Sequence, residues 1–314
     1  MRKKVMIVGA GNVGATVAHW IASRELADVV LIDIVEGMPQ GKALDLSEAG
    51  PVEGFDLKII GTNNYEDTAN SDVVVITAGV PRRKDPKTGE YPSRDELVKT
   101  NQKIVAQVVQ NVVKHSPNTI LVLVSNPLDA MCHVALHESG FPRNRIIGQA
   151  GALDTARYKT FIAMELGLSV EDVSALVLGG HGDTMVPLPN HTSISGIPVL
   201  ELMDRETLDG IITRTRKGGG EIVGLLGYSG FYAPASAVVS MVESILKDKK
   251  RVIPCAAYLK GEYGYEDLFI GVPVVLGASG IEKVIEMDLS AEEKAMLDHS
   301  AEAVRSVVEV LGYE

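Results

Sequence analysis

The sequence is poor in cysteine. Its two cysteines, Cys132 and Cys255, lie in apolar segments and have no metal-ligand spacing. This argues against a disulfide scaffold and against a thiolate metal site, so we expect no metal. Two unpaired thiols in apolar surroundings are typical of a reducing compartment, and the sequence therefore predicts a cytoplasmic protein.

Long apolar runs and clusters of basic residues are also missing. No apolar segment approaches the ~18 residues that a membrane span requires. The formal net charge is −11 at pH 7, whereas a nucleic-acid surface needs gathered lysine and arginine. We therefore expect neither a membrane nor a nucleic-acid partner.

The composition is otherwise that of a soluble globular protein, with 46% hydrophobic and 23% charged residues. A length of 314 residues is long for one core and comfortable for two domains. Internal repeats and long linkers are not evident.

The start of the chain has the pattern of a βαβ unit. A short β-branched apolar run at residues 5–8 predicts a buried parallel strand, and residues 15–22 predict a helix. A second apolar run at residues 29–32 ends in Asp33, which predicts an acid at the tip of the second strand.

Three glycines lie at the first turn of this unit. Gly9 permits a tight turn, Gly11 leaves room for a pyrophosphate near the backbone, and Gly14 lets the helix lie close to the strand. The positive end of the helix dipole then faces the phosphates. Glycines also mark ordinary turns, but Asp33 follows Gly14 by 19 residues, as a dinucleotide site requires.

Asp33 indicates which dinucleotide binds. Its carboxylate can accept hydrogen bonds from the adenosine ribose hydroxyls, and the next residues, Ile34 and Val35, supply no positive charge for a 2′-phosphate. The sequence therefore predicts NAD as the cofactor rather than NADP.

Strand and helix patterns continue to alternate along the first half. Strands are expected at residues 57–62, 73–79 and 119–124, and helices at 41–46 and 95–114. Such alternation predicts parallel pairing in a doubly wound α/β sheet, whose ligands lie beyond the carboxyl ends of its strands.

The second half changes character near Gly148. A helix is expected up to Leu166, then a strand at 173–178, helices at 206–227, 235–247 and 290–311, and strands at 256–259 and 268–276. The helix at 206–227 is expected to be interrupted and kinked at Gly218-Gly219-Gly220. Ser290 and Glu293 form a capping-box pattern at the last helix. We therefore predict a Rossmann domain at 1–147 and a mixed α+β substrate domain at 148–314.

Several polar residues stand out at these positions. His181 is flanked by Gly180 and Gly182, which leave its imidazole open to a small molecule, whereas the other histidines lie in helical or polar contexts. Asp154 and Arg157 are three residues apart and share a helix face, where a plain surface ion pair is the alternative.

Two strand ends offer further candidates. Asn126 follows one strand and could hold a ligand or merely shape a turn. The loop at 80–94 follows another strand and carries several basic residues, which would be ordinary for a solvated surface loop.

Four motifs, in order and spread over nearly the whole chain, resemble those of the lactate/malate dehydrogenase family: Gly9-Ala10-Gly11-Asn12-Val13-Gly14, Ser125-Asn126-Pro127-Leu128-Asp129, Leu153-Asp154-Thr155-Ala156-Arg157 and Gly179-Gly180-His181-Gly182-Asp183. Tyr232-Ala233-Pro234-Ala235 makes the chain most similar to the malate dehydrogenases of lactate-dehydrogenase-like type.

The resemblance implies a role for each matching residue. His181 is the proton donor and acceptor, Asp154 orients it and stabilises its imidazolium form, and Arg157 binds the substrate carboxylate. Arg94 polarises the substrate carbonyl, and Arg82 selects a second carboxylate.

The resemblance also implies contacts with the cofactor and substrate at other positions. Asn126 matches the asparagine that contacts substrate, and Asn12, Val13, Asn101, Val124 and Asn126 are implied to lie along the NAD site with Gly9, Gly11, Gly14 and Asp33.

The loop departs from the family pattern. Eleven residues lie between Arg82 and Arg94, where the family has about five, so Arg83 is an alternative to Arg82 at the selecting position.

Physical chemistry supports these roles. A base that titrates near neutrality suits the transfer of a hydroxyl proton, and arginine makes paired charge-assisted bonds to carboxylates. Because malate has two carboxylates and lactate one, a basic selecting residue favours malate.

We therefore predict an NAD-dependent malate dehydrogenase that assembles as a dimer or tetramer. The alternatives are an L-lactate dehydrogenase, a non-catalytic dinucleotide-binding protein and a structural component of an oligomer.

Overall fold

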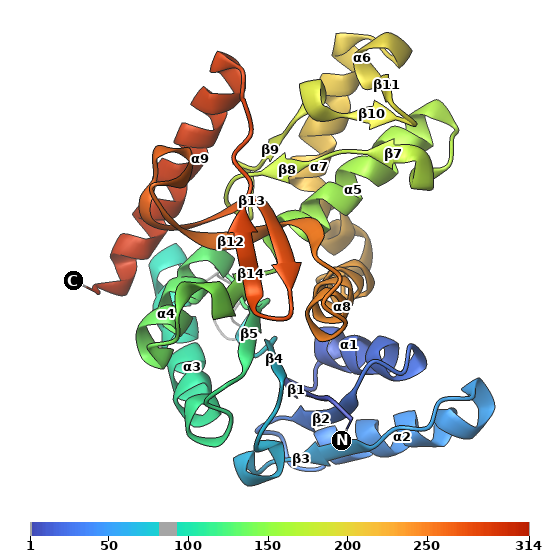
Figure 1. The fold of residues 1–314 in the computed structure, drawn as a ribbon, viewed down its shortest axis with the longest axis vertical. Helices are drawn as coiled ribbons and strands as arrows, with labels where there is room; N and C mark the ends of the chain where they lie inside the picture. The colour runs from blue at the N-terminus through green and yellow to red at the C-terminus, as the bar shows by residue number, and fades with distance from the viewer. Residues whose placement is uncertain (1, 82–92, 314) are drawn as a thin grey trace.

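The structure is a computed structural model that describes residues 2–81 and 93–313 (Figure 1). A nine-stranded sheet runs through the molecule in the order β14-β13-β12-β6-β5-β4-β1-β2-β3. Its strands are β1 (Lys4–Val8), β2 (Asp28–Ile32), β3 (Ile59–Thr62), β4 (Val73–Ile76), β5 (Ile120–Leu123), β6 (Ile146–Gly148), β12 (Arg251–Lys260), β13 (Glu266–Gly277) and β14 (Gly280–Val284).

The first six strands are parallel and form the doubly wound part of the sheet. Val5 of β1 pairs with Val29 of β2 on one side and with Val73 of β4 on the other. The strand order changes direction at β1, where the first helix leaves the sheet. This arrangement confirms the predicted α/β fold with an N-terminal Rossmann sheet.

Helices cover both faces of the sheet, which explains why its strands are apolar on both sides. The α-helices are α1 (Asn12–Ser23), α2 (Met38–Glu53), α3 (Arg94–His115), α4 (Leu128–Ser139), α5 (Ala150–Leu166), α6 (Val199–Leu202), α7 (Arg205–Leu226), α8 (Tyr232–Leu246) and α9 (Ala291–Val308). Val5 and Ile7 belong to the core that contains α1 and α8, whereas Met6 and Val8 belong to the core that contains α3 and α4.

The C-terminal strands extend the same sheet instead of forming a separate one. β12 pairs antiparallel with β6 through Ala256 and Gly148, and β13 and β14 follow as antiparallel neighbours. The change from parallel to antiparallel pairing therefore occurs beside the predicted domain boundary.

The single strand predicted at 173–178 is wrong. The chain forms β7 (Val173–Ser174), which pairs with β10 (Ser193–Ile194), and then β8 (Val177–Leu178), which pairs with β9 (Val186–Pro187). At the first residue of β8, the Val177 N–H donates to the Thr155 hydroxyl of α5 at 3.0 Å instead of to a neighbouring strand. This contact lets the chain change sheets. The short strand β11 (Ile197–Pro198) completes the sheet of β7 and β10.

The interruption predicted at Gly218-Gly219-Gly220 is also wrong, because α7 is one continuous helix from Arg205 to Leu226. The capping box of Ser290 and Glu293 is present as predicted, with the Glu293 N–H donating to the Ser290 hydroxyl at 3.2 Å.

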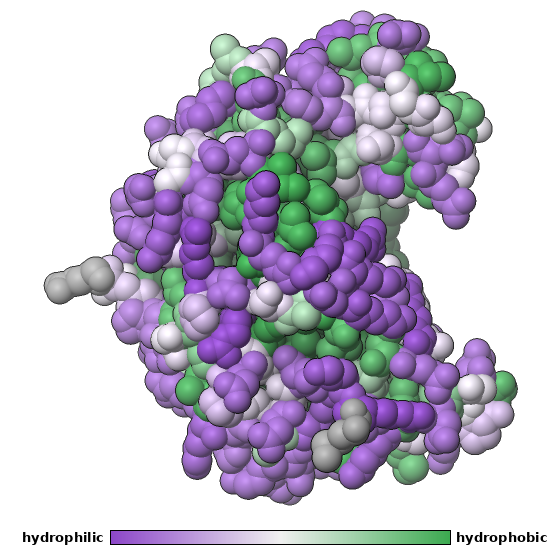
Figure 2. Space-filling view, in the orientation of Figure 1, coloured by the Kyte–Doolittle hydropathy of each residue, from purple (hydrophilic) through white to green (hydrophobic). Residues whose placement is uncertain are grey.

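No helix in the described part of the chain is both long and apolar enough to cross a bilayer. The face seen in Figure 2 is largely hydrophilic, with apolar surface gathered near its centre. At the right of this view the outline is indented between the part that contains α6 and α7 and the part that contains α1 and α2 (Figures 1 and 2).

Candidate active site

The glycine-rich turn joins β1 to α1 with very close contact between backbones. A Cβ atom on Gly14 would lie 1.9 Å from the Gly9 carbonyl oxygen, so only glycine permits this approach of helix and strand. Gly9 has a φ of +99°, a conformation that side chains disfavour, and a Cβ there would lie 2.6 Å from the Thr77 hydroxyl oxygen.

The N-terminus of α1 has the chemistry of an anion site. Gly11 is its N-cap residue and provides no side-chain cap, so the first N–H groups of the helix are left for a ligand. No described heavy atom lies within 4 Å of a Cβ built on Gly11, apart from its chain neighbours. The residues present therefore fit a dinucleotide pyrophosphate.

Asp33 is fixed against this turn. One of its carboxylate oxygens accepts the Ala10 N–H at 2.7 Å and the other accepts the Val35 N–H at 3.0 Å. The side chain is half-buried, and each oxygen retains a lone pair for a ribose hydroxyl.

Asn101 of α3 braces the ends of two strands. Its side chain accepts the Val80 N–H at 2.7 Å and donates to the backbone oxygens of Val80 and Asn126. Asn126 is exposed just beyond β5, and its peptide bond to Pro127 is cis. Val124 precedes it and donates its N–H to the Ile76 carbonyl at 2.9 Å. Asn101 therefore holds together the strand ends that face the predicted ligand site.

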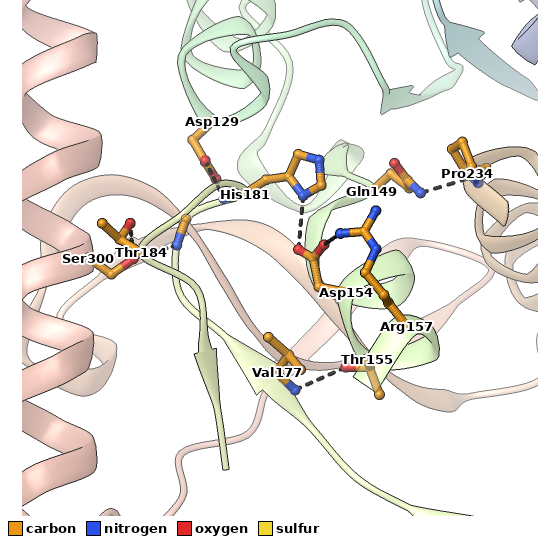
Figure 3. A network of polar contacts seen from close by, with 11 residues as sticks. Asp129, Gln149, Asp154, Thr155, Arg157, Val177, His181, Thr184, Pro234 and Ser300 are labelled. Atoms are coloured by element: carbon orange, nitrogen blue, oxygen red, sulfur yellow. Dashed lines mark hydrogen bonds and ion pairs between the residues drawn. The ribbon is translucent and has the colours of Figure 1, made fainter. Parts of the chain in front are cut away.

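His181, Asp154 and Arg157 form a connected group (Figure 3). The Nδ1 of His181 lies 2.9 Å from a carboxylate oxygen of Asp154, and the other oxygen of Asp154 lies 3.4 Å from a guanidinium nitrogen of Arg157. Asp154 is 2% exposed in its side chain, so the simple surface ion pair considered for Asp154 and Arg157 does not describe this contact.

This geometry fixes the chemistry of the imidazole. With its Nδ1–H donated to Asp154, the Nε2 of neutral His181 is a proton acceptor that points away from Asp154 (Figure 3). Burial alone would lower the pKa of His181. The charge and hydrogen bond of Asp154, with a further contribution from Asp129, outweigh burial and raise that pKa above its usual value.

Arg157 packs against α7 at Gly218, where the helix has no side chain. A Cβ on Gly218 would be 2.3 Å from Cδ of Arg157, so a side chain at that position would collide with the arginine. Nearby, the buried side chain of Gln149 donates to the Pro234 carbonyl at 3.4 Å and links the start of α5 to α8 (Figure 3).

Not all predicted residues join this group. Arg94 is exposed at the first position of α3, and no hydrogen bond described for it reaches His181, Asp154 or Arg157. Arg82 and its alternative Arg83 lie outside the described residues. The structure therefore brings together His181, Asp154 and Arg157, and the roles of Arg82, Arg83 and Arg94 stay predictions.

The sequence reasoning assigned no role to Asp129, Ser300 or Gly218. Asp129 accepts the His181 N–H at 3.0 Å, and Ser300 accepts the Gly180 N–H at 2.9 Å. Asp129 had one local signal, because it is an acid among the apolar residues Leu128, Ala130 and Met131 at the start of a helix. Ser300 had none, since it lies 120 residues from the N–H group that it accepts.

Comparison with known protein families matches the two halves of the chain to two different domains. Residues 3–148 match the NAD binding domain of lactate/malate dehydrogenases, and residues 151–311 match their alpha/beta C-terminal domain. The chain belongs to the lactate/malate dehydrogenase family. It is therefore an NAD-dependent 2-hydroxy-acid oxidoreductase whose first half binds NAD.

Similar proteins within the family include both malate dehydrogenases and lactate dehydrogenases. A malate dehydrogenase of Roseiflexus sp. (strain RS-1) is 58% identical over 312 residues, which are 99% of each chain. The solved malate dehydrogenase of Salinibacter ruber is 53% identical, with a TM-score of 0.93 over 98% of this chain and 97% of that one. A lactate dehydrogenase of Cryptosporidium parvum, solved with lactic acid and NAD, is 40% identical, with a TM-score of 0.94 over 100% and 99%. Backbone shape alone therefore does not separate the two activities, whereas sequence identity is higher to these malate dehydrogenases.

Proposed function

We propose that this protein is an NAD-dependent malate dehydrogenase, which transfers a hydride reversibly between (S)-malate and oxaloacetate. The observation that carries the proposal is the connected group of His181, Asp154 and Arg157, which supplies a base, its orienting carboxylate and a carboxylate-binding arginine. The 58% identity to a malate dehydrogenase over the full chain supports the choice of substrate.

The residues of the chain divide the reaction between them. When bound, NAD supplies the hydride acceptor through its nicotinamide ring. The Nε2 of His181 takes the malate hydroxyl proton, and Asp154 holds Nδ1–H and stabilises the imidazolium that forms. Arg157 binds the carboxylate beside the reacting carbon through two charge-assisted bonds.

The remaining substrate contacts come from residues that the family resemblance implies. Asn126 contacts substrate, Arg94 polarises the carbonyl, and Arg82 binds the second carboxylate. The same resemblance supports Asn12, Val13, Asn101 and Val124 as cofactor contacts.

The decisive assay follows NADH oxidation with oxaloacetate, pyruvate and α-ketoglutarate side by side. We expect oxaloacetate to be preferred over pyruvate, and a preference for pyruvate would instead support an L-lactate dehydrogenase. Turnover of none of them would support a non-catalytic dinucleotide-binding protein or a structural oligomer component.

A His181→Asn variant tests the role of the imidazole in the same assay. General acid–base groups typically contribute ~10²–10⁴-fold, so we expect a loss of that order in turnover. NADH binding, followed by fluorescence titration, should be nearly unchanged because the βαβ unit is untouched. Near-normal turnover would remove His181 from the mechanism.

We also propose a homodimer or homotetramer. Several large apolar side chains are exposed on α2 and at the end of α7, including Leu44, Val52, Leu225 and Leu226. Such side chains on neighbouring turns are candidates for burial between copies of the chain. A monomer mass by light scattering at working concentration would contradict this proposal.

Further proposals concern the location of the protein, its metabolic role and its domain bounds. Cys132 and Cys255 are buried and free, which supports a cytoplasmic location. The proposed malate and oxaloacetate chemistry supports a role in the tricarboxylic acid cycle. We retain residues 1–147 and 148–314 as the proposed domains.

A further inference from the structure

Three consecutive N–H groups around His181 are held by three different elements. The Gly179 N–H donates to the Gly271 carbonyl of β13 at 2.9 Å, and the Gly180 N–H donates to the Ser300 hydroxyl of α9 at 2.9 Å. The His181 N–H donates to a carboxylate oxygen of Asp129 in α4 at 3.0 Å (Figure 3). The backbone that carries the imidazole is therefore fixed from β13, α9 and α4 together.

Asp129 differs from the other two acceptors because it is a carboxylic acid. It is 6% exposed and lies at the second position of α4, where its neighbours Leu128, Ala130 and Met131 are also buried. One oxygen, Oδ2, accepts the His181 N–H, whereas Oδ1 is buried and has no hydrogen-bond partner among the described residues.

A structural role alone does not require this charge. A neutral oxygen suffices as acceptor, as Ser300 demonstrates at the next N–H group. Burying a carboxylate is costly unless a positive charge or several hydrogen bonds compensate it. The N-terminus of α4 offers a partial positive charge, and among the described residues His181 in its protonated form is a second source.

We propose that Asp129 is a positioning residue that fixes the backbone of His181 and, as a second carboxylate besides Asp154, favours the protonated form of its imidazole. The inference rests on the proposed role of His181 as proton donor and acceptor. In oxaloacetate reduction the protonated imidazole is the reactant, and in malate oxidation it is the product, so the charge of Asp129 affects both directions.

Within residues 2–81 and 93–313, the charges that act on His181 come from three side chains. Asp154 of α5 raises the pKa of the imidazole, Asp129 of α4 raises it further, and Arg157 of α5 opposes both. The contact with α9 is the uncharged hydroxyl of Ser300, and that with β13 is the Gly271 carbonyl. Burial raises the pKa of Asp129 itself to about 6, against the His181 N–H and the His181 charge, which lower it. Asp129 is therefore mainly ionised at pH 6.5 and more fully so at higher pH.

The test compares two variants that each weaken one bond to this backbone. Asp129→Asn retains the size and an oxygen acceptor but removes the charge. Ser300→Ala removes the acceptor of the neighbouring N–H without changing any charge, which makes it the matched control for a loosened backbone. Asp129→Ser, a smaller neutral residue that also retains an acceptor, replaces Asp129→Asn if that variant does not fold.

The first readout does not depend on turnover. Diethyl pyrocarbonate modifies neutral imidazole, so its rate of reaction with His181, followed by mass spectrometry of the peptide that contains it, reports protonation in the protein without substrate. At pH 6.5 we expect a roughly five- to tenfold faster modification in Asp129→Asn than in the parent, because an opposite charge has been removed. The rates should converge at alkaline pH, and Ser300→Ala should follow the parent at every pH.

The second readout is kcat/KM for oxaloacetate reduction against pH. As the pH rises, activity should fall at a lower pH in Asp129→Asn than in the parent, because reduction needs the protonated imidazole. We expect a maximum that is roughly 10- to 100-fold lower, by analogy with the loss found for residues that orient a metal ligand. Ser300→Ala should keep the midpoint of the parent even if its maximum falls.

The two results separate this inference from the proposed function. If the parent reduces oxaloacetate but the pH dependence of His181 modification is the same in Asp129→Asn, the inference fails alone. If Ser300→Ala shifts the pH dependence as much as Asp129→Asn, backbone position and not charge is responsible, and the inference is overturned. If the parent reduces no 2-oxo acid, the proposed function fails, while the modification experiment still measures the effect of Asp129 on His181.

Discussion

Gly218 should be required for binding of the substrate carboxylate, although it is part of a helix and touches no substrate itself. A Cβ at this position would lie 2.3 Å from Cδ and 2.8 Å from Nε of Arg157, where ordinary contact begins at 3.4 Å. The arginine side chain would therefore have to move by about 1 Å in Gly218→Ala. A misplacement of about 1 Å in a positioned group can lower the rate roughly 100-fold.

The neighbouring glycines provide matched controls. A Cβ on Gly219 would lie 4.0 Å from a guanidinium nitrogen of Arg157, and a Cβ on Gly220 would meet no described atom within 4 Å. Replacing either by alanine should stabilise α7, because alanine is more favourable than glycine by about 1 kcal/mol in a helix interior. Gly219→Ala and Gly220→Ala should therefore raise the melting temperature by a few degrees and leave KM for oxaloacetate unchanged.

Gly218→Ala should instead raise KM and lower kcat/KM for oxaloacetate by 10- to 100-fold, which corresponds to about 1.4 to 2.8 kcal/mol of lost transition-state stabilisation. NADH affinity should not change, because α1 and Asp33 are remote from this contact. Steady-state kinetics, calorimetry and NADH titration on the three variants test the reasoning. An equal loss of activity in all three would attribute the effect to stiffening of α7, and normal kinetics in Gly218→Ala would show that Arg157 adapts freely.

Three further predictions follow from single residues. Burial lowers the pKa of His133 from 6.5 to about 4, and its Nε2 accepts the Phe269 N–H. Because the folded state needs neutral His133, the free energy of unfolding should fall by about 3 kcal/mol as the pH drops from 6.5 toward 4. The urea midpoints of His133→Gln should lack this part of the dependence on pH. Asp33→Ser should narrow the preference for NADH over NADPH, and equal use of both by the parent would contradict the proposed NAD site. Arg82→Gln should weaken turnover of oxaloacetate far more than turnover of pyruvate, because only oxaloacetate has a second carboxylate that loses its charge partner. This loss typically costs a few kcal/mol of binding free energy. If Arg83→Gln alone has this effect, Arg83 is the selecting residue.

The parts of the fold that were predicted correctly depend on local rules. The apolar runs predicted as strands at residues 5–8, 29–32 and 119–124 form buried parallel strands, because a strand covered on both faces needs short runs that are apolar on both sides. The capping box at Ser290 formed because its partner is three residues away. Asp154 and Arg157 met for the same reason, since they are separated by less than one helical turn.

The two elements that were predicted wrongly depend on packing. Three glycines in a row weaken an isolated helix, yet α7 stays helical because its buried face, which includes Gly218, lies against α5. The segment 173–178 is apolar except for Ser174, and it is divided where the Thr155 hydroxyl accepts the Val177 N–H. Neither contact has a signature in the segment itself.

The sequence by itself determined which residues are candidates for the chemistry, because the glycine turn, Asp33 and the glycine-flanked His181 are defined by residue type and close neighbours. Only the tertiary structure decided how these residues act on one another. His181 lies 27 residues from Asp154 and 52 from Asp129, yet the three side chains and one N–H group meet within hydrogen-bonding distance. Contacts over such separations depend on how whole helices and strands pack, and local patterns do not contain that information.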